Sequence, residues 1–581
     1  MVGRNAAPFG RRQEETGSCI RRSGLQEPFG SFSAIGSCRF KHRGSAASYF
    51  LFINQSLHIP RYQQTKDRTT KGAMDACARF QAPCDQMRLA VALPSAAAAD
   101  VIPAVCLAAV SIAFAPVLHV FSPFLAISVE TLIGLAIVLA APAYAPSIAI
   151  FILLFQNLFV SLFSSYLSSP SELEFVKGYN FLLCAVMWLG TLALYLLRQR
   201  DHSAEVNRIM WWGIAALATV MLYFAVGFLQ NPLAASIYLR NIVLPLFLFQ
   251  LALLTTATFE VRVTPFLVAV GIALLFCGYL ELLFRDFWLD VTNGYAFWHF
   301  DELKATHSGV WEAEMRATGN VPVDLKDRFR FSFLNTPLLE DLGLSNILRI
   351  FGPNMSPISF GYGVGFFSLF LFSVGRPLLA VSALPLLVLC SVKGALIMTI
   401  FVWAAWVSTR LLGPVVTLLL GLATLVIYVV VAIHVGLQIG DYHVIGFMGG
   451  WNGFLQNPFG RGLGVGGNLS EGFFSIDWSA AQQAGTVDGA VESATGVLLY
   501  QMGMAALVPL GFYFGMALKA WRLYASSGNL TQGLSSFGVI VLLFNGFFQE
   551  EALFAPPALG MMLCLTGLVI GNQIRSQTLS A

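Results

Sequence analysis

A series of apolar runs, each about 18–22 residues long, repeats through this sequence after residue 100 and constrains the fold more than any other feature. A helix of that length crosses the roughly 30 Å of hydrocarbon in a bilayer. The sequence therefore predicts an all-α integral membrane protein, a polytopic bundle of about 12–14 transmembrane helices. The fourteen candidate runs are 101–121, 124–141, 146–167, 179–197, 209–229, 241–258, 265–284, 357–375, 377–391, 394–409, 414–436, 495–517, 533–548 and 555–572. The pair at 377–409 allows two readings, one kinked helix or a hairpin broken at Ser391–Gly394.

Composition excludes the main soluble classes. Charged residues make up 11% of the 581 residues, whereas an ordinary globular domain carries about 25%, so a soluble multi-domain enzyme is ruled out. Nine cysteines are scattered without a CxxC pair, and several lie inside apolar runs, where Cys packs as a small hydrophobe. Neither a disulfide framework nor a zinc site is predicted.

The first 95 residues differ from the rest of the chain. Residues 1–100 hold 14 Lys and Arg against 7 Asp and Glu, and they are rich in Ser, Gly and Gln. We predict that 1–95 is a disordered, basic, cytoplasmic segment, too dilute in charge for a nucleic-acid domain. Met74 and Met87 are in-frame alternative starts, and a start codon assigned too far upstream would give this composition. Residues 96–575 form the predicted transmembrane domain.

Basic residues in the short loops give the orientation. With fourteen crossings, all of them fall on the side of the basic N-terminus, which the positive-inside rule assigns to the cytoplasm. Both termini are therefore predicted to be cytoplasmic. Two long loops, 285–356 and 437–494, then lie outside, and the first is expected to form short amphipathic helices. The short-loop basic residues are Arg198, Arg200, Arg208, Arg262, Arg376, Arg410, Lys519, Arg522 and Arg575.

Four cations break this charge rule at the outer ends of helices or in the loops near them: Arg240, Arg349, Lys393 and Arg461. An ionisable group at membrane depth indicates function, and its partner should be anionic. Converging Arg and Lys at a lipid–water boundary suit the phosphate groups of a lipid carrier. The alternative is that each side chain snorkels to the outer headgroups.

The glycine-rich stretch 460–467 is not interpreted as a nucleotide-binding loop. It does not follow a strand of a βαβ unit, and the topology places it outside, away from ATP. We expect its glycines to let a tight loop approach a ligand or a neighbouring helix.

Three local patterns then follow one another in order. Arg349–Pro357 resembles the R-x-x-G-x-x-x-x-P region of the O-antigen ligase and polymerase (Wzy-like) family. Ser391–Ala395 resembles its S-R-G-A helix start, with Lys in place of Arg, and Trp451 with Asn457–Gly464 resembles its W-x(n)-N-P-x-G-x-G-x-G stretch. Glu492–Gly503 looks like the helix that follows. The resemblance covers about residues 240–515.

The resemblance implies a membrane glycosyltransferase of the GT-C type in the bacterial inner membrane. Members of the family transfer a glycan from undecaprenyl diphosphate to an acceptor on the periplasmic face, without metal, nucleotide or other cofactor. A chain-length regulator and a flippase are expected partners by analogy, and no nucleic acid is expected. Because the leaving group is a lipid diphosphate, cations near it stabilise the charge that develops.

Candidate site residues follow from this reading. Arg240, Arg349, Lys393 and Arg461 are predicted to bind the lipid diphosphate, with Arg349 also catalytic. Family ligases carry a His–Asn pair where this chain has Glu492-Ser493, so Glu492 is the predicted base for the acceptor hydroxyl, and His443 is the second candidate. The predicted sugar-stacking residues are Trp288, Trp298 and Trp451, although interfacial anchoring is a commoner role for Trp.

Three functions remain open at this point. The absence of the ligase-type His favours a polymerase of exopolysaccharide or O-antigen repeats. The alternatives are an O-antigen ligase acting on lipid A core, and a flippase or transporter, which the intramembrane Glu130 keeps open. Gln156, Glu281 and Gln549 to Glu551 are further polar positions near helix ends.

Overall fold

The computed structural model of the chain describes residues 95–307, 330–331, 347–469 and 476–580. The chain divides into two units, Met1–Ala82 and Pro83–Ala581, and every described residue lies in the second. The predicted disordered segment 1–95 thus lies outside the described residues except for Ser95, as does much of the loop 285–356.

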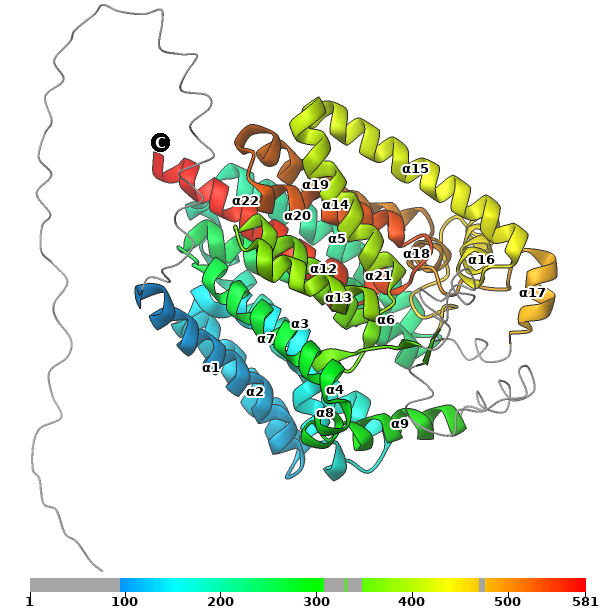
Figure 1. Cartoon of the computed structure of the whole chain (residues 1–581), viewed down its shortest axis with the longest axis horizontal. Coiled ribbons are helices and arrows are strands. Elements are labelled where there is room, and N and C mark those ends of the chain that lie inside the picture. Colours follow the sequence, from blue (N-terminus) through cyan, green and yellow to red (C-terminus); the bar gives the residue numbers. More distant parts are fainter. Residues whose placement is uncertain (1–94, 308–329, 332–346, 470–475, 581) are drawn as a thin grey trace, which may run out of the picture. The chain divides into compact units, whose positions relative to one another are not determined.

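The described chain is almost entirely helical (Figure 1). Two-residue strands β1 (Arg330–Phe331) and β2 (Ile347–Leu348) pair antiparallel, with Arg330 opposite Leu348. The helices are α1 (Ser95–His119), α2 (Pro123–Ala140), η2 (Pro142–Tyr144), α3 (Ala145–Leu162), η3 (Ser164–Tyr166), α4 (Pro170–Leu197), η4 (Gln199–Asp201), α5 (Ala204–Phe228), α6 (Pro232–Thr258), α7 (Val263–Leu283), α8 (Arg285–Val291), α9 (Gly294–His307), η7 (Gly352–Asn354), α12 (Pro357–Ser373), α13 (Pro377–Leu389), α14 (Lys393–Leu412), α15 (Pro414–Ile439), α16 (Tyr442–Gln456), α17 (Trp478–Ala484), α18 (Ala494–Met502), η9 (Gly503–Ala506), α19 (Leu507–Ser527), α20 (Leu530–Asn545), α21 (Glu551–Phe554), η10 (Pro556–Gly560) and α22 (Met561–Ser580).

Eleven described helical segments are long and apolar enough to cross a membrane, which identifies a multi-pass helical membrane protein. Three shorter apolar helices, α12, α13 and α20, lie where the sequence predicted the remaining crossings. Each of the fourteen predicted runs therefore falls on one of these fourteen segments. The pair at 377–409 is a hairpin of two helices, α13 and α14, and not one kinked helix.

Capping residues in the local sequence set the starts of several helices. Ser169, Asn231 and Ser356 each precede a proline, and each side chain accepts a hydrogen bond from a backbone N–H in the first helical turn. Such capping satisfies otherwise orphaned donors, and proline at the first helical position has a preset φ and no N–H to lose. These caps fix where α4, α6 and α12 begin.

The core of the bundle is the pair α6 and α22, which are largely surrounded by other helices. Gly567 and Gly571 of α22 allow this close packing, because a Cβ at Gly567 would lie 2.5 Å from the carbonyl oxygen of Phe249. By contrast, α15 lies at the edge of the bundle (Figure 1), and only 17% of its most apolar stretch is buried. The long apolar surface of α15 is thus left for lipid.

The two ends of the bundle differ in what they carry. The starts of α12 and α14 and the ends of α15 and α20 meet at one end, which we call the site end. The opposite end, where α6 and α12 finish and α20 begins, is called the basic end. At the site end α8 and α9 pack on α3, α4 and the 349–355 segment, forming a second small core that includes Trp288, Phe297 and Phe351.

Candidate functional site

A cavity of about 430 Å³ at the site end brings together four of the predicted site residues. We call it the main cavity. Arg349, Lys393, His443 and Glu492 all line it, although they are spread over more than 140 positions of the sequence. The other lining residues are Ile358, Ser391, Val392, Gly394, Ile397, Tyr428, Ala432, Val435, Gly436, Ile439, Asp441, Val444, Asn545, Phe548, Gln549 and Glu551.

One wall of the main cavity is apolar and the other is charged. The last turns of α15 supply the apolar wall through Ala432, Val435, Gly436 and Ile439. Because α15 lies at the edge of the bundle, this wall adjoins the surface left for lipid. The cavity therefore suits an amphiphilic ligand with an ionic head and a hydrocarbon tail.

A buried carboxylate on α7 shapes the loop that carries Arg349. Glu281 is fully buried, and its carboxylate accepts backbone hydrogen bonds from Phe351 at 3.1 Å and Gly352 at 2.6 Å. Nη2 of Arg285 donates to Glu281 Oε1 at 2.9 Å and to the carbonyl oxygen of Arg349 at 2.5 Å. Glu281 thus connects α7 and α8 to the segment that begins at Arg349.

The Arg349 side chain is itself held in place. Its Nε donates to the carbonyl oxygen of Cys390 at 2.9 Å, at the end of α13. Burial lowers the pKa of Arg349, while the nearby Glu551 opposes that shift. An arginine still carries its charge at neutral pH. The guanidinium is therefore a fixed, partly desolvated cation at the wall of the main cavity.

Lys393 is the first residue of α14, and the start of that helix faces the main cavity. The preceding Val392 provides no side-chain cap, so the N-terminal dipole of the helix adds to the positive charge of Lys393. Gly394 is required at the next position because a Cβ there would overlap Oε1 of Gln549 and the hydroxyl of Tyr362. The sequence resemblance at Ser391–Ala395 therefore coincides with a tightly packed corner.

His443 and Glu492 form a pair in the main cavity. Nδ1 of His443 lies 3.2 Å from the carbonyl oxygen of Glu492 and 3.6 Å from Oε2 of its carboxylate. A carbonyl oxygen only accepts hydrogen bonds, so Nδ1 carries a proton and neutral His443 keeps its lone pair on Nε2. The pair thus has the form of a base with a carboxylate beside it.

The backbone at Glu492 is also constrained. Its φ is +57°, a left-handed conformation that a non-glycine residue rarely adopts, and Ser391 on the same cavity has φ +53°. Asn468 holds Glu492 by accepting its backbone N–H at 2.9 Å and donating to Oε1 at 3.2 Å. Burial raises the pKa of the Glu492 carboxyl; His443 and Asn468 oppose the rise and Glu551 adds to it. Such strain is found where the surrounding structure enforces a functional geometry.

The main cavity is not simply electropositive. Asp441 and Glu551 line it beside Glu492, so three carboxylates face two cations. Asp441 is partly occupied as the N-cap of α16, because its Oδ1 accepts from the backbone N–H of His443 at 3.0 Å and of Val444 at 3.2 Å. The sequence placed Glu551 in an acidic short loop on the outer side and among the polar positions near helix ends, but not among the site residues. The cavity can therefore both bind an anion and accept a proton.

The other two predicted diphosphate ligands lie elsewhere. Arg461 makes contacts within the protein: Nη1 donates to the carbonyl oxygen of Gly453 at 2.9 Å, and its guanidinium lies 4.1 Å from the ring centroid of Tyr500. The glycines around it let the loop approach helices, as expected, since Gly462 lies against the backbone of Gly227. Arg240 lines a separate cavity on α3, α4 and α6.

The three predicted sugar-stacking tryptophans occupy different environments. Trp288 is buried in the small core beneath α8 and α9. Trp298 lines a small cavity next to Phe297. Trp451 is 39% exposed on α16 and packs against Phe454. None of the three lines the main cavity.

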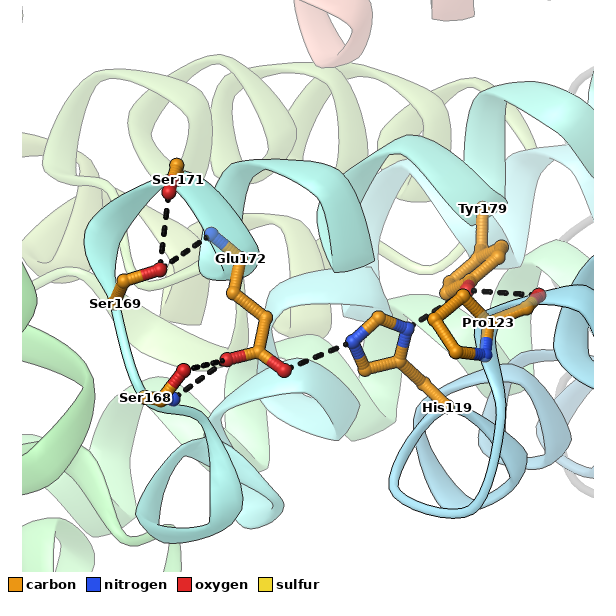
Figure 2. A network of polar contacts seen from close by, with 7 residues as sticks. All are labelled: His119, Pro123, Ser168, Ser169, Ser171, Glu172 and Tyr179. Carbon is orange, nitrogen blue, oxygen red and sulfur yellow. Dashed lines mark hydrogen bonds and ion pairs between the residues drawn. The ribbon is translucent and has the colours of Figure 1, made fainter.

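A polar network at the site end of α1 was not predicted (Figure 2). His119 is buried, with Nδ1 2.8 Å from the Tyr179 hydroxyl and Nε2 3.2 Å from Oε1 of Glu172. The backbone N–H and the hydroxyl of Ser168 both donate to Glu172 Oε2 at 2.6 Å. This network joins the end of α1 to the first turns of α4. A lone histidine at the end of an apolar run gives no sequence signal for it.

Within the described residues, no three His, Cys, Asp or Glu side chains stand close enough to hold a metal ion. Comparison with protein-family models, curated proteins and solved structures finds no match to this chain. The geometry of the main cavity and the sequence resemblance are therefore the two indications of its function.

Proposed function

We propose that this protein is a membrane glycosyltransferase, a polysaccharide polymerase that joins undecaprenyl-diphosphate-linked repeat units on the periplasmic face of the bacterial inner membrane. The observation that carries the proposal is the main cavity itself. Arg349 and Lys393 share it with the pair His443 and Glu492, beside the apolar wall of α15. Cations, a base and a lipid-facing wall are the three parts that this reaction requires.

In the proposed reaction the cations act on the leaving group. The bond between the anomeric carbon of the donor sugar and the diphosphate oxygen breaks, and negative charge gathers on the lipid diphosphate. Arg349 can bind phosphate oxygens through its planar fork, while Lys393 acts as a point charge at the start of α14. Cations held in a partly desolvated site stabilise this developing charge without reorganising.

The base acts on the acceptor. Nε2 of neutral His443 takes the proton of an acceptor sugar hydroxyl as its oxygen bonds to the anomeric carbon from the face opposite the leaving group. The Glu492 carboxylate lies beside the resulting imidazolium and stabilises it. In this assignment Glu492, the first candidate for the base from the sequence, supports His443, the second candidate.

The apolar wall accommodates the lipid. Ala432, Val435 and Ile439 continue the exposed apolar face of α15, so a polyprenyl chain can leave the cavity along this helix. A soluble nucleotide sugar would gain nothing from such a wall. This feature favours a lipid-linked donor.

A transport function is the second candidate, and one residue favours it. Glu130 on α2 is fully buried, and neither carboxylate oxygen has a hydrogen-bond partner among the described residues. An intramembrane carboxylate of this kind is typical of proton-coupled transport. Glu130 lies outside the main cavity, however, so this candidate leaves the charges there without a role.

The deciding experiment uses purified protein in lipid nanodiscs with a lipid-diphosphate-linked repeat unit. We expect wild type to form a ladder of polymer and Arg349→Ala to leave single repeats. The matched control is Arg410→Ala, because Arg410 is exposed at the basic end of α14 and should leave the ladder unchanged. A wild-type protein that moves single repeats across a membrane without joining them would identify a flippase.

A further inference from the structure

The geometry points to a second ligand site: a separate cavity of about 270 Å³ on α3, α4 and α6 binds an acidic sugar of the acceptor glycan. We call it the second cavity. Naming the ligand an acceptor rests on the proposed function, whereas binding of the sugar does not. The carboxamides of Gln156 and Asn180 and the guanidinium of Arg240 line this cavity, and aromatic rings lie next to it.

Two carboxamides that line the second cavity are available to a ligand. Asn180 is only 4% exposed, and neither it nor Gln156 makes a hydrogen bond to another described residue. A polar molecule that enters the cavity can therefore bond to both amides. Side-chain amides pair well with sugar hydroxyls, because each amide both donates and accepts.

The second cavity holds two cations and one carboxylate. Nζ of Lys177 pairs with Oε1 of Glu174 at 3.0 Å, and Glu174 also acts electrostatically on Arg240. Arg240 has no carboxylate within 4 Å among the described residues, and its Nε contacts only Oδ1 of the adjacent Asn241, at 3.3 Å. Two cations against one carboxylate leave the lining with an excess of positive charge, which favours an anionic ligand. A hydroxyl-rich ligand with one acidic group satisfies both the amides and Arg240.

Aromatic rings lie next to these polar groups. A smaller cavity of about 150 Å³ shares Lys177 and Asn157 with the second cavity and adds Phe297 and Trp298. Nζ of Lys177 lies 5.0 Å from the ring centroid of Phe297. The apolar face of a sugar ring packs against an aromatic face. This places Trp298, one of the predicted sugar-stacking residues, where a neighbouring sugar of the same glycan would extend.

Two chain segments, 349–359 and 549–557, line both the main and the second cavity. The main cavity is lined by the first residue of each segment, Arg349 and Gln549. Ser359 and Pro557, at the ends of the same segments, line the second cavity. The two cavities therefore flank shared structure, as a donor site and an acceptor site must when one sugar attacks another.

The test measures binding directly, on the full chain purified in detergent, by saturation-transfer difference NMR. The probes are methyl β-D-glucuronide and methyl β-D-glucoside, which differ only in the carboxylate. We expect the glucuronide to bind more tightly, Arg240→Gln to weaken it about tenfold without changing the glucoside, and Asn180→Ala to weaken both. Arg410→Gln, at an exposed position of the basic end, is the matched control and should change neither.

Several outcomes would overturn the inference. These are equal binding of the two probes, binding unchanged in both Arg240→Gln and Asn180→Ala, or complete displacement of the glucuronide by equimolar inorganic phosphate, which would identify a bare oxyanion site. If the variants fail to fold, a diazirine-bearing glucuronide is cross-linked to wild type. Adducts within 152–184 or 240–244 support the site, and adducts confined to 391–444 contradict it.

Failure here is distinguishable from failure of the proposed function. If wild type polymerises and both variants polymerise at its rate with the same acceptor KM, the second cavity is not an acceptor site and the polymerase assignment stands. If wild type binds the glucuronide through Arg240 but never polymerises, the sugar site stands and the polymerase assignment falls.

Discussion

The two cavities at the site end hold cations in contrasting surroundings. In the main cavity Arg349 and Lys393 stand among three carboxylates and a histidine. In the second cavity Arg240 stands among carboxamides and hydroxyls, with a single carboxylate, Glu174, that pairs with the neighbouring Lys177. Groups that exchange protons suit bond making and breaking, whereas amides and hydroxyls only hold a ligand. Cations at outer helix ends, which break the same charge rule in the sequence, therefore belong to two different kinds of site.

The sharpest test of this contrast separates kcat from KM. We expect Lys393→Ala to lower kcat by about 10²–10³-fold, because it removes a cation that acts on developing charge. Arg240→Gln should raise the KM for the acceptor about tenfold and leave kcat unchanged, because a binding contact made equally in ground and transition states affects KM. Steady-state kinetics in nanodiscs with each lipid-linked substrate varied in turn provides the measurement. Equal losses of kcat in both variants would erase the distinction between the cavities.

The next effect concerns the pair in the main cavity. Burial and Glu551 raise the pKa of Glu492 above its ordinary range, against the opposing effects of His443 and Asn468. We expect His443→Ala to lower kcat about 10²-fold or more, and Glu492→Gln to lower it about tenfold, since the supporting charge is removed but the base remains. Rate–pH profiles of both variants check this.

The pH profiles also discriminate between the two bases. Since a carboxylate acts as a base only when ionised, activity that depends on Glu492 falls as pH drops through its raised pKa. This fall in activity at low pH should remain in His443→Ala and be absent from Glu492→Gln. If Glu492→Gln were the more damaging change, Glu492 itself would be the base.

Much of the fold could be predicted from the sequence, and less of the site. The apolar runs locate all fourteen candidate segments because hydrocarbon thickness sets helix length, and α13 and α14 are separated at the predicted break. The sequence also named Arg349, Lys393, His443 and Glu492, which share one cavity. It grouped Arg240 and Arg461 with them because all four break the same charge rule, and no local pattern reveals which helices are neighbours.

The residues that sequence reasoning missed act through tertiary contacts. Glu281 was noted only as a polar position, and its role depends on backbone N–H groups that lie 70 positions away along the chain. Asn180 carries no motif, and its proposed role comes from a cavity lined by α3, α4, α6 and two further chain segments. A buried acid near the end of an apolar run was the one available signal for Glu281, because such a group requires partners.

A smaller effect is expected from Glu281, which positions Arg349 without touching the main cavity. The carboxylate of Glu281 accepts hydrogen bonds from three N–H groups. In Glu281→Gln the new NH₂ group would face one of these N–H donors, and that hydrogen bond would be lost. We expect kcat to fall about 10-fold and thermal stability to fall as well. Added guanidinium restoring activity to Arg349→Ala but not to Glu281→Gln would show that the two act differently. Unchanged kcat in a destabilised Glu281→Gln would reduce its role to folding.

The smallest effect is expected where the two cavities meet the 549–557 segment. Glu550 is 8% exposed, and its Oε1 accepts a hydrogen bond from the Tyr238 hydroxyl at 3.1 Å. Burial, with the charges of Glu551 and Glu492 adding to it, raises the pKa of Glu550 to about 8. An acid whose pKa is higher in the folded than in the unfolded protein stabilises the fold below its unfolded pKa, and that stability is lost as pH rises toward 8.

We therefore expect the melting temperature of wild type to fall by a few degrees between pH 5 and pH 9, and that of Glu550→Gln not to show this fall. The control Glu260→Gln, at an exposed position of the basic end, should follow wild type. Parallel melting curves for all three proteins would mean that Glu550 ionises as freely as a surface acid, and the segment between the cavities would then be open to water.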